Sequence, residues 1–325
     1  MSAGLSRREL LGGAIALTPF LQAKAAGPGP RGVVVETNAH IYSTELFDFH
    51  PNRTYTPDPF PLEDYVKHVQ EAGIGPVLIV HPTTYQDDHR SVEYYVKNEP
   101  SPGFFKGTCF FDPVDPKTPA RMKDLADRNP GRFVALRIFE NRKASDAPKV
   151  PATTPTIVDR DLRDPNFKAT WKAAGDTGMG IQMNAIPGHA PQVRALAEQF
   201  PNVPLIIDHL SRPQLGTPEE YEHVLKLAEL PHAYMKFTSV RGASKEEYPH
   251  LDLKPLARRL IDGFGPDRIL WGTLGNNVNA FERNAAMFDQ IFDFISEADR
   301  AKIRGLNAVK LFKFENAEYL KNVKI

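Results

Sequence analysis

The sequence has very little cysteine, since Cys109 is the one cysteine among 325 residues. A single cysteine excludes an intramolecular disulfide, even in an oxidising compartment. Cys109 lies in an apolar run, residues 108–111, with no histidine close to it in the sequence. This pattern favours a buried packing residue over a nucleophile.

The sequence also lacks an excess of charge of either sign, with 40 basic and 40 acidic residues. Balanced charge without a basic stripe argues against nucleic acid as a partner. The apolar stretch at residues 10–21 is too short to span a bilayer comfortably and is interrupted by glycine and proline. We therefore expect a small-molecule substrate, no nucleic acid and no stable membrane association once a signal is removed. The oligomeric state has no signature in the sequence.

The first 25 residues have the pattern of a targeting segment rather than of a fold. Residues 6–11, SRRELL, resemble the twin-arginine export motif, and the small-x-small pattern of a cleavage site follows at 23–25. The alternative is an ordinary N-terminal helix or a disordered arm. We expect a signal peptide at 1–25, recognised by the twin-arginine export machinery, and a periplasmic or secreted bacterial protein.

After residue 30, short β-branched or aromatic runs alternate with stretches of helical spacing. The predicted strands are 33–38, 76–81, 105–111, 133–138, 180–184, 204–208, 233–238 and 268–272. The predicted helices are 62–72, 90–98, 117–129, 165–176, 189–199, 217–229, 253–263 and 281–296. This alternation predicts an α/β protein, a single (β/α)₈ barrel over residues 26–325. A doubly wound sheet is the alternative, but the loop after residues 33–38 has no glycine.

Polar residues gather where the predicted strands end. Glu36, Asn38 and His40 alternate at the end of the first strand and therefore share one face. Polar side chains are costly to bury unless they serve a site. Other strands end in or near polar residues: His81, Tyr85, Arg137, Asn184, Asp208, His209, Lys236 and Asn276. Because barrel active sites lie at the carboxyl ends of strands, we expect one shared pocket there, walled by the insertions 43–60 and 139–163.

Each of these residues also has a structural explanation. A lone histidine at a strand end, such as His81, is more often a hydrogen-bonded structural residue than a catalyst. Lys236 and Arg137 are the types that neutralise carboxylates within a barrel. Asp208 and His209 are neighbours, so the pleat is expected to send them to opposite sides, with at most one facing the lumen.

Four segments carry a resemblance to a known family. Residues 36–40, ETNAH, stand where that family has D-x-H-x-H, and the other segments are 201–213 (PNVPLIIDHLSRP), 264–272 (FGPDRILWG) and 303–312 (IRGLNAVKLF). On these motifs the chain resembles the amidohydrolase-related barrel hydrolases, in particular the branch of sugar lactonases and 2-pyrone-4,6-dicarboxylate lactonase. The resemblance covers nearly all of the chain after the signal segment and implies a (β/α)₈ barrel with hydrolase activity.

The chain departs from the family at the positions that carry its chemistry. Asn38 and Asn184 stand where family members have metal-binding histidines, and Glu36 replaces the usual aspartate. Leu274 aligns with the strand-eight aspartate that activates the attacking water. The resemblance therefore implies no tight binuclear centre and no cofactor, or at most a single divalent zinc held weakly by His40, His209 and Glu36.

Three functions follow as hypotheses. The first is a hydrolase that opens a lactone or similar cyclic ester with little or no metal dependence. In it His209 and Arg137 polarise the carbonyl, and His40 or Glu36 is the general base. His81, Tyr85, Asn184, Lys236 and Asn276 would bind the substrate. The second is a catalytically lapsed barrel that binds a small acidic or hydroxylated ligand, and the third is a metal-dependent decarboxylase or lyase.

Overall fold

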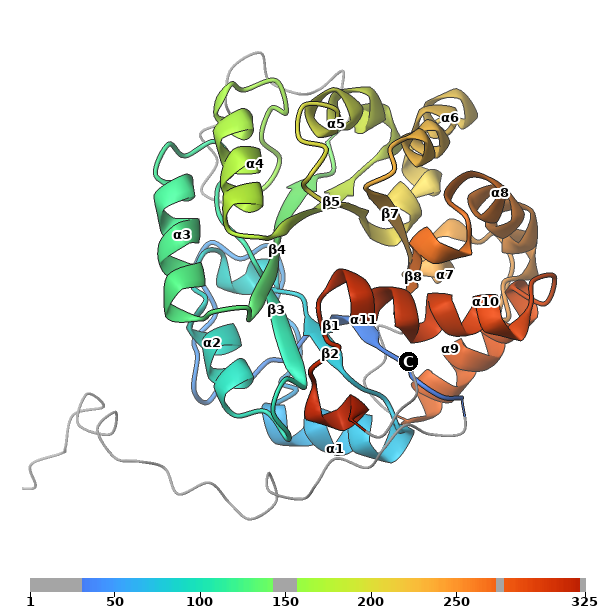
Figure 1. The fold of residues 1–325 in the computed structure, drawn as a ribbon, viewed down its shortest axis with the longest axis horizontal. Coiled ribbons are helices and arrows are strands. Elements are labelled where there is room, and N and C mark those ends of the chain that lie inside the picture. The colour runs from blue at the N-terminus through green and yellow to red at the C-terminus, as the bar shows by residue number, and fades with distance from the viewer. Residues whose placement is uncertain (1–30, 143–156, 273–277, 322–325) are drawn as a thin grey trace, which may run out of the picture.

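The computed structural model describes residues 31–142, 157–272 and 278–321. Within them, eight parallel strands pair in chain order from β1 to β8 (Figure 1). They are β1 (Glu36–Ala39), β2 (Val77–Ile79), β3 (Phe105–Cys109), β4 (Phe133–Glu140), β5 (Gly180–Ala185), β6 (Leu205–Ile207), β7 (Ala233–Phe237) and β8 (Ile269–Trp271). The Thr37 hydroxyl donates to the Trp271 carbonyl at 2.7 Å, which links β1 to β8. The predicted (β/α)₈ barrel is confirmed.

Helices surround the strands, as the βαβ pattern requires (Figure 1). They are α1 (Leu62–Ala72), α2 (Arg90–Lys97), α3 (Thr118–Arg128), α4 (Asn166–Asp176), α5 (Ala190–Ala197), α6 (Pro218–Leu225), α7 (Val240–Ala243), α8 (Lys254–Phe264), α9 (Val278–Ile291), α10 (Glu297–Ala301) and α11 (Asn307–Leu311). The start of α6 shows why local sequence predicts them. Thr217 and Glu220 form a reciprocal capping box, with bonds of 3.2 and 2.8 Å. None of the helices in the described residues is long and apolar enough to cross a membrane.

The core is continuous across the barrel strands and the inner faces of the helices. Cys109 is fully buried, with its Sγ 3.8 Å from the Sδ of Met179, and burial raises the pKa of its thiol. A thiol in that setting remains protonated at neutral pH, which agrees with the packing role expected from the sequence.

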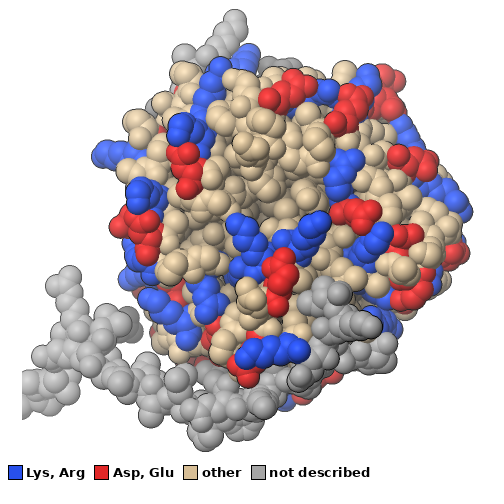
Figure 2. Space-filling view, viewed as in Figure 1, with Lys and Arg blue, Asp and Glu red and all other residues tan. Residues whose placement is uncertain are grey.

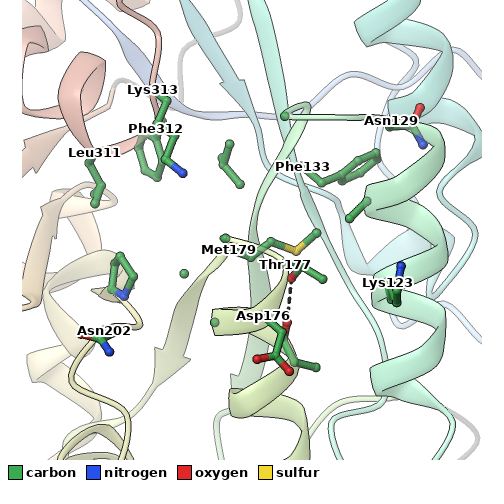
Figure 3. Close-up of a pocket in the computed structure, with 18 of the residues that line it drawn as sticks. Lys123, Asn129, Phe133, Asp176, Thr177, Met179, Asn202, Leu311, Phe312 and Lys313 are labelled. Atoms are coloured by element: carbon green, nitrogen blue, oxygen red, sulfur yellow. Dashed lines mark hydrogen bonds between the residues drawn. The ribbon is translucent and has the colours of Figure 1, made fainter.

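The N-terminal ends of the strands meet the C-terminal part of the chain. Helix α11 lies across the barrel in Figure 1, and Lys106 of β3 donates to the Lys313 carbonyl just beyond that helix at 2.8 Å. Figure 2 shows a mostly uncharged hollow on this face. It has a volume of about 760 Å³, and Phe133, Met179 and Phe312 are among the residues that line it (Figure 3). This hollow lies at the end of the barrel opposite to the polar strand ends.

Candidate active site

A buried charged cluster occupies the barrel interior near the carboxyl ends of the strands. Asp208, the residue after β6, forms an ion pair with Lys236, whose Nζ is 2.8 Å away, and another with Arg137, whose Nε is 3.2 Å away. The Gln182 amide of β5 donates to both carboxylate oxygens at 3.0 and 3.1 Å. Burial alone would raise the pKa of Asp208, but the charges of Lys236 and Arg137 hold it well below its usual range. Asp208 is therefore an ionised carboxylate at the centre of the cluster.

Asn38 joins this cluster from the first strand. Lys236 Nζ donates to Asn38 Oδ1 at 2.7 Å, and the Lys236 side chain has no exposed surface. The Lys236 ammonium therefore contacts Asp208 and Asn38, and the substrate-binding role expected for it stays a prediction. Arg137 is 3% exposed, and its guanidinium lies over the Phe139 ring with the carbon 4.6 Å from the centroid. The structural interpretation of these two cations, neutralisation of a carboxylate inside the barrel, fits their contacts.

The chain leaves β6 in a left-handed turn. His209, Leu210, Ser211 and Arg212 have φ angles of 52°, 58°, 55° and 51°. None of the four is glycine, and the left-handed region costs an L-residue about 1–2 kcal/mol. The pleat does not determine how Asp208 and His209 face, because the strand ends at Ile207 and His209 lies in the turn.

His209 lies beside the cluster and borders a cavity. Its Nδ1 is 2.7 Å from the hydroxyl of Thr238, the residue after β7. Burial lowers the pKa of His209 to about 3, and the opposing effect of Asp208 does not offset it. The ring is therefore neutral at physiological pH.

His40 is half-buried at the end of β1, and its tautomer is fixed. Its Nδ1 lies 2.8 Å from the Val80 carbonyl, which can only accept, so Nδ1 carries the proton. Nε2 then holds a lone pair. Burial, with a further contribution from Arg137, lowers the pKa of His40 to about 3, so Nε2 is available as a proton acceptor over the neutral range.

The remaining predicted site residues occupy different surroundings. Glu36 is buried and accepts from the Asn38 backbone N–H at 2.8 Å. Gly272 permits this approach to β8, because a Cβ there would lie 2.9 Å from Glu36 Oε1. His81 is fully buried and donates from Nε2 to the Gln86 carbonyl at 2.7 Å, as a structural histidine does.

Tyr85 lies in a short helical turn after β2, and Asn184 lies in β5. Tyr85 is buried, with its ring centroid 5.3 Å from that of Phe49 in the insertion after β1. Asn184 Oδ1 accepts from Arg212 Nε at 3.0 Å. Asn276 and Leu274 lie outside the described residues.

A cavity of about 890 Å³ opens between the ends of β6, β7 and β8. Both His209 and Arg212 line it, because residues three apart on the left-handed turn face the same side. Its lining also includes Thr238, Trp271, Gly272, Arg241, Glu247, Tyr248 and Arg283. Three guanidinium groups on one cavity favour a negatively charged ligand. Gln182 and Arg212 were not among the site residues predicted from the sequence, although Arg212 stands in the 201–213 motif, and Asp208 was noted there without a role in the site.

The donor set does not suit a divalent metal. The described residues contain no group of three or more histidine, cysteine or carboxylate side chains arranged to hold one. The strongest anion, Asp208, has both oxygens engaged by Lys236, Arg137 and Gln182, and Asn38 Oδ1 is also engaged by the Lys236 ammonium. A divalent ion at this place would meet two fixed positive charges.

Curated relatives of the chain include lactone-cleaving enzymes. It is 24% identical over 299 residues to the 4-sulfomuconolactone hydrolase of Hydrogenophaga intermedia, covering 85% of this chain and 88% of that protein. It is 29% identical over 142 residues to the L-fucono-1,5-lactonase of Burkholderia ambifaria, covering 40% of this chain and 48% of that protein.

Solved structures share the fold. A probable 2-pyrone-4,6-dicarboxylic acid hydrolase of Acinetobacter baumannii, with citric acid bound, superposes with a TM-score of 0.67 at 15% identity over 86% of this chain and 99% of that one. An amidohydrolase of Burkholderia multivorans with bound zinc gives 0.63 at 15% identity over 87% and 99%. Residues 35–314 match the amidohydrolase family profile across all eight strands. The chain belongs to the amidohydrolase family.

Proposed function

We propose that the protein is a hydrolase that opens a lactone or similar cyclic ester bearing a negatively charged group. One observation carries the proposal: the neutral imidazole of His209 and the guanidinium of Arg212 line the same cavity at the carboxyl end of the barrel. The names of the lactone-cleaving relatives support the reaction class.

The chemistry divides among three side chains. In this role His209 Nδ1 accepts from the Thr238 hydroxyl, 2.7 Å away, and its Nε2–H donates to the ester carbonyl oxygen as negative charge develops there. Arg212 binds the anionic group of the substrate. His40 Nε2 takes a proton from water as its oxygen bonds to the carbonyl carbon, and returns that proton to the ring oxygen when the ester C–O bond breaks.

The buried cluster beneath the cavity supports this arrangement. Lys236 and Arg137 carry two positive charges, which are opposed by the paired Asp208 and, for Lys236, also by the charge of Glu36. Two cations in a water-poor interior next to the cavity favour an anionic transition state. We propose that the enzyme has little or no metal dependence, because this resident positive charge occupies the place of a Lewis acid.

The test is a lactone panel with matched variants. The full chain would be assayed by acid release on 2-pyrone-4,6-dicarboxylate, 4-sulfomuconolactone and the uncharged L-fucono-1,5-lactone. Arg212→Gln is expected to raise KM for the two anionic lactones and leave it unchanged for the uncharged one. Arg259→Gln, an exposed arginine paired with Glu222, is the control. Equal KM changes on charged and uncharged substrates would contradict the assigned role.

A catalytically lapsed barrel that binds a small acidic or hydroxylated ligand is the second candidate. The replacement of the strand-eight aspartate by Leu274 favours it, because that aspartate activates water in the family. Thermal shifts separate the two candidates. Stabilisation by acids or lactones without turnover at high enzyme concentration would support binding alone.

A metal-dependent decarboxylase or lyase is the third candidate. The structure of a dihydroxybenzoic acid decarboxylase of Polaromonas with bound manganese shares the fold, with a TM-score of 0.60 at 16% identity. Metal analysis of protein purified without chelator distinguishes it. Stoichiometric zinc or manganese would favour this function and count against metal independence.

We also propose that the protein is exported by the twin-arginine route and acts in the periplasm or outside the cell. The paired residues Arg7 and Arg8 and the following apolar stretch support this. Cell fractionation with Arg7→Lys/Arg8→Lys tests it. Retention of the variant in the cytoplasm is expected, and unchanged export would contradict the proposal.

A further inference from the structure

The left-handed turn 209–212 places two cavity residues, and its own conformation is unfavourable. His209 and Leu210 have φ/ψ angles of 52°/43° and 58°/18°, and Ser211 and Arg212 continue with positive φ. Left-handed conformations normally occur as single residues in L-polypeptides. Four in succession persist only where the surroundings hold them.

Three hydrogen bonds to residues outside the turn hold it in place. The hydroxyl of Tyr221, a buried residue of α6, donates to the Leu210 carbonyl at 2.9 Å. The Ser211 hydroxyl donates to the Ala185 carbonyl, at the end of β5, at 2.8 Å. Asn184 Oδ1 accepts from Arg212 Nε at 3.0 Å. The turn is therefore tied to β5 and to α6.

The handedness of the turn decides which way its side chains face. Residues at positions i and i+3 of a tight turn lie on one side of it. His209 and Arg212 accordingly both line the 890 Å³ cavity, while Leu210 is fully buried and anchors the turn between them. A relaxed backbone with negative φ would direct the two side chains elsewhere.

We propose that Tyr221 and Ser211 are positioning residues, which hold the left-handed turn so that His209 and Arg212 face the substrate together. Neither acts on the substrate itself. Tyr221 Oη fixes the second residue of the turn through its carbonyl, and Ser211 Oγ fixes the third. This proposal rests on the proposed lactone hydrolysis. It adds which residues hold the substrate-facing side chains in position.

Tyr221→Phe tests the proposal against a matched control. Tyr319→Phe removes a similar bond, from a buried tyrosine hydroxyl to the Gly73 carbonyl at 3.3 Å, near the N-terminal end of the barrel. Tyr221→Phe is expected to lower kcat/KM for 2-pyrone-4,6-dicarboxylate at least about tenfold. Tyr319→Phe is expected to leave it within about twofold. Equal effects of the two substitutions would overturn the proposal.

Ser211 provides a rescue experiment at one position. Ser211→Ala and Ser211→Gly both lose the bond to Ala185, but only glycine adopts positive φ without a steric cost. We expect Ser211→Ala to lower kcat through His209 and to raise KM for the anionic lactone through Arg212. Ser211→Gly is expected to recover most of both. A glycine variant no better than the alanine variant would overturn the proposal.

Failure of the lactone assay is distinguishable from failure of this inference. If the wild-type chain opens none of the lactones, the proposed function fails, and the turn is judged from NMR spectra of ¹⁵N-histidine-labelled protein. A shift of the His209 ring resonances in Tyr221→Phe, absent in Tyr319→Phe, supports positioning by Tyr221. Unchanged His209 resonances overturn it.

Discussion

The ammonium of Lys236 lies 2.8 Å from the carboxylate of Asp208, and neither side chain has any exposed surface. The two groups come from β7 and from the residue after β6. Removing one partner of a buried ion pair leaves the other charge unpaired in a medium that solvates it poorly. The pair therefore governs both the stability of the barrel and the charge beneath the cavity.

Asp208→Asn is expected to lower the free energy of unfolding by about 3–5 kcal/mol, since it leaves Lys236 and Arg137 buried without the carboxylate that pairs with both. Urea unfolding measures the change. Glu222→Gln is the control, because Glu222 pairs with Arg259 on the surface and such pairs contribute less than about 1 kcal/mol. Similar small losses in both variants would mean that the buried pair does not hold the barrel.

Lactone opening is expected to show no acid limb near pH 6.5. Burial lowers the pKa of both His40 and His209 to about 3, so both rings stay neutral as the pH falls from 8 to 5. The measurement is kcat/KM across that range in buffers of constant ionic strength. A fall in kcat/KM centred near the ordinary histidine pKa would show that one of the rings must ionise there.

Glu140 at the end of β4 is expected to make stability depend on pH in the opposite sense to a carboxylate whose pKa is lowered by an ion pair. Burial, with a contribution from Asp159, raises its pKa to about 7. A raised folded-state pKa favours the protonated form, so this contribution to stability is complete below about pH 4.5 and is lost as the pH rises through about 7.

Glu140→Gln removes that dependence. Relative to the wild type, the variant is expected to gain stability between pH 5 and pH 8, by an amount on the order of 1–3 kcal/mol. Thermal or urea unfolding at the two pH values measures the difference. A stability difference between variant and wild type that is the same at both pH values would show that Glu140 titrates normally.

Zinc is expected to bind weakly and to leave activity unchanged. Lys236 and Arg137 already neutralise Asp208, so a divalent ion would have to displace them or lie beside them. Calorimetric titration with zinc and assays after chelator treatment measure this. Stoichiometric binding with loss of activity on zinc removal would contradict the proposed metal independence.

The sequence predicted the barrel because its signals are local. The strands are short apolar runs such as residues 77–79 and 205–207, and capping residues such as Thr217 mark helix starts. These features depend on neighbours along the chain, so their spacing suffices to predict eight βα units.

The arrangement of the site could not be predicted from the spacing of residues along the chain. The pleat rule does not determine how His209 faces, because it applies only while a strand continues, and no residue from 209 to 212 is a glycine that would announce a left-handed turn. The burial of Lys236 depends on its contacts with Asp208 and with Asn38, and Asn38 is 198 residues from Lys236 in the sequence. The sequence showed that polar residues gather at the strand ends, but it did not show which of these residues reach the cavity.

The most direct test of the account is the turnover of 2-pyrone-4,6-dicarboxylate by the wild type, His40→Ala and His209→Ala, each checked for folding by circular dichroism. We predict turnover by the wild type and a loss of about 10²-fold or more in kcat for each folded variant. Wild-type rates in both variants would contradict it.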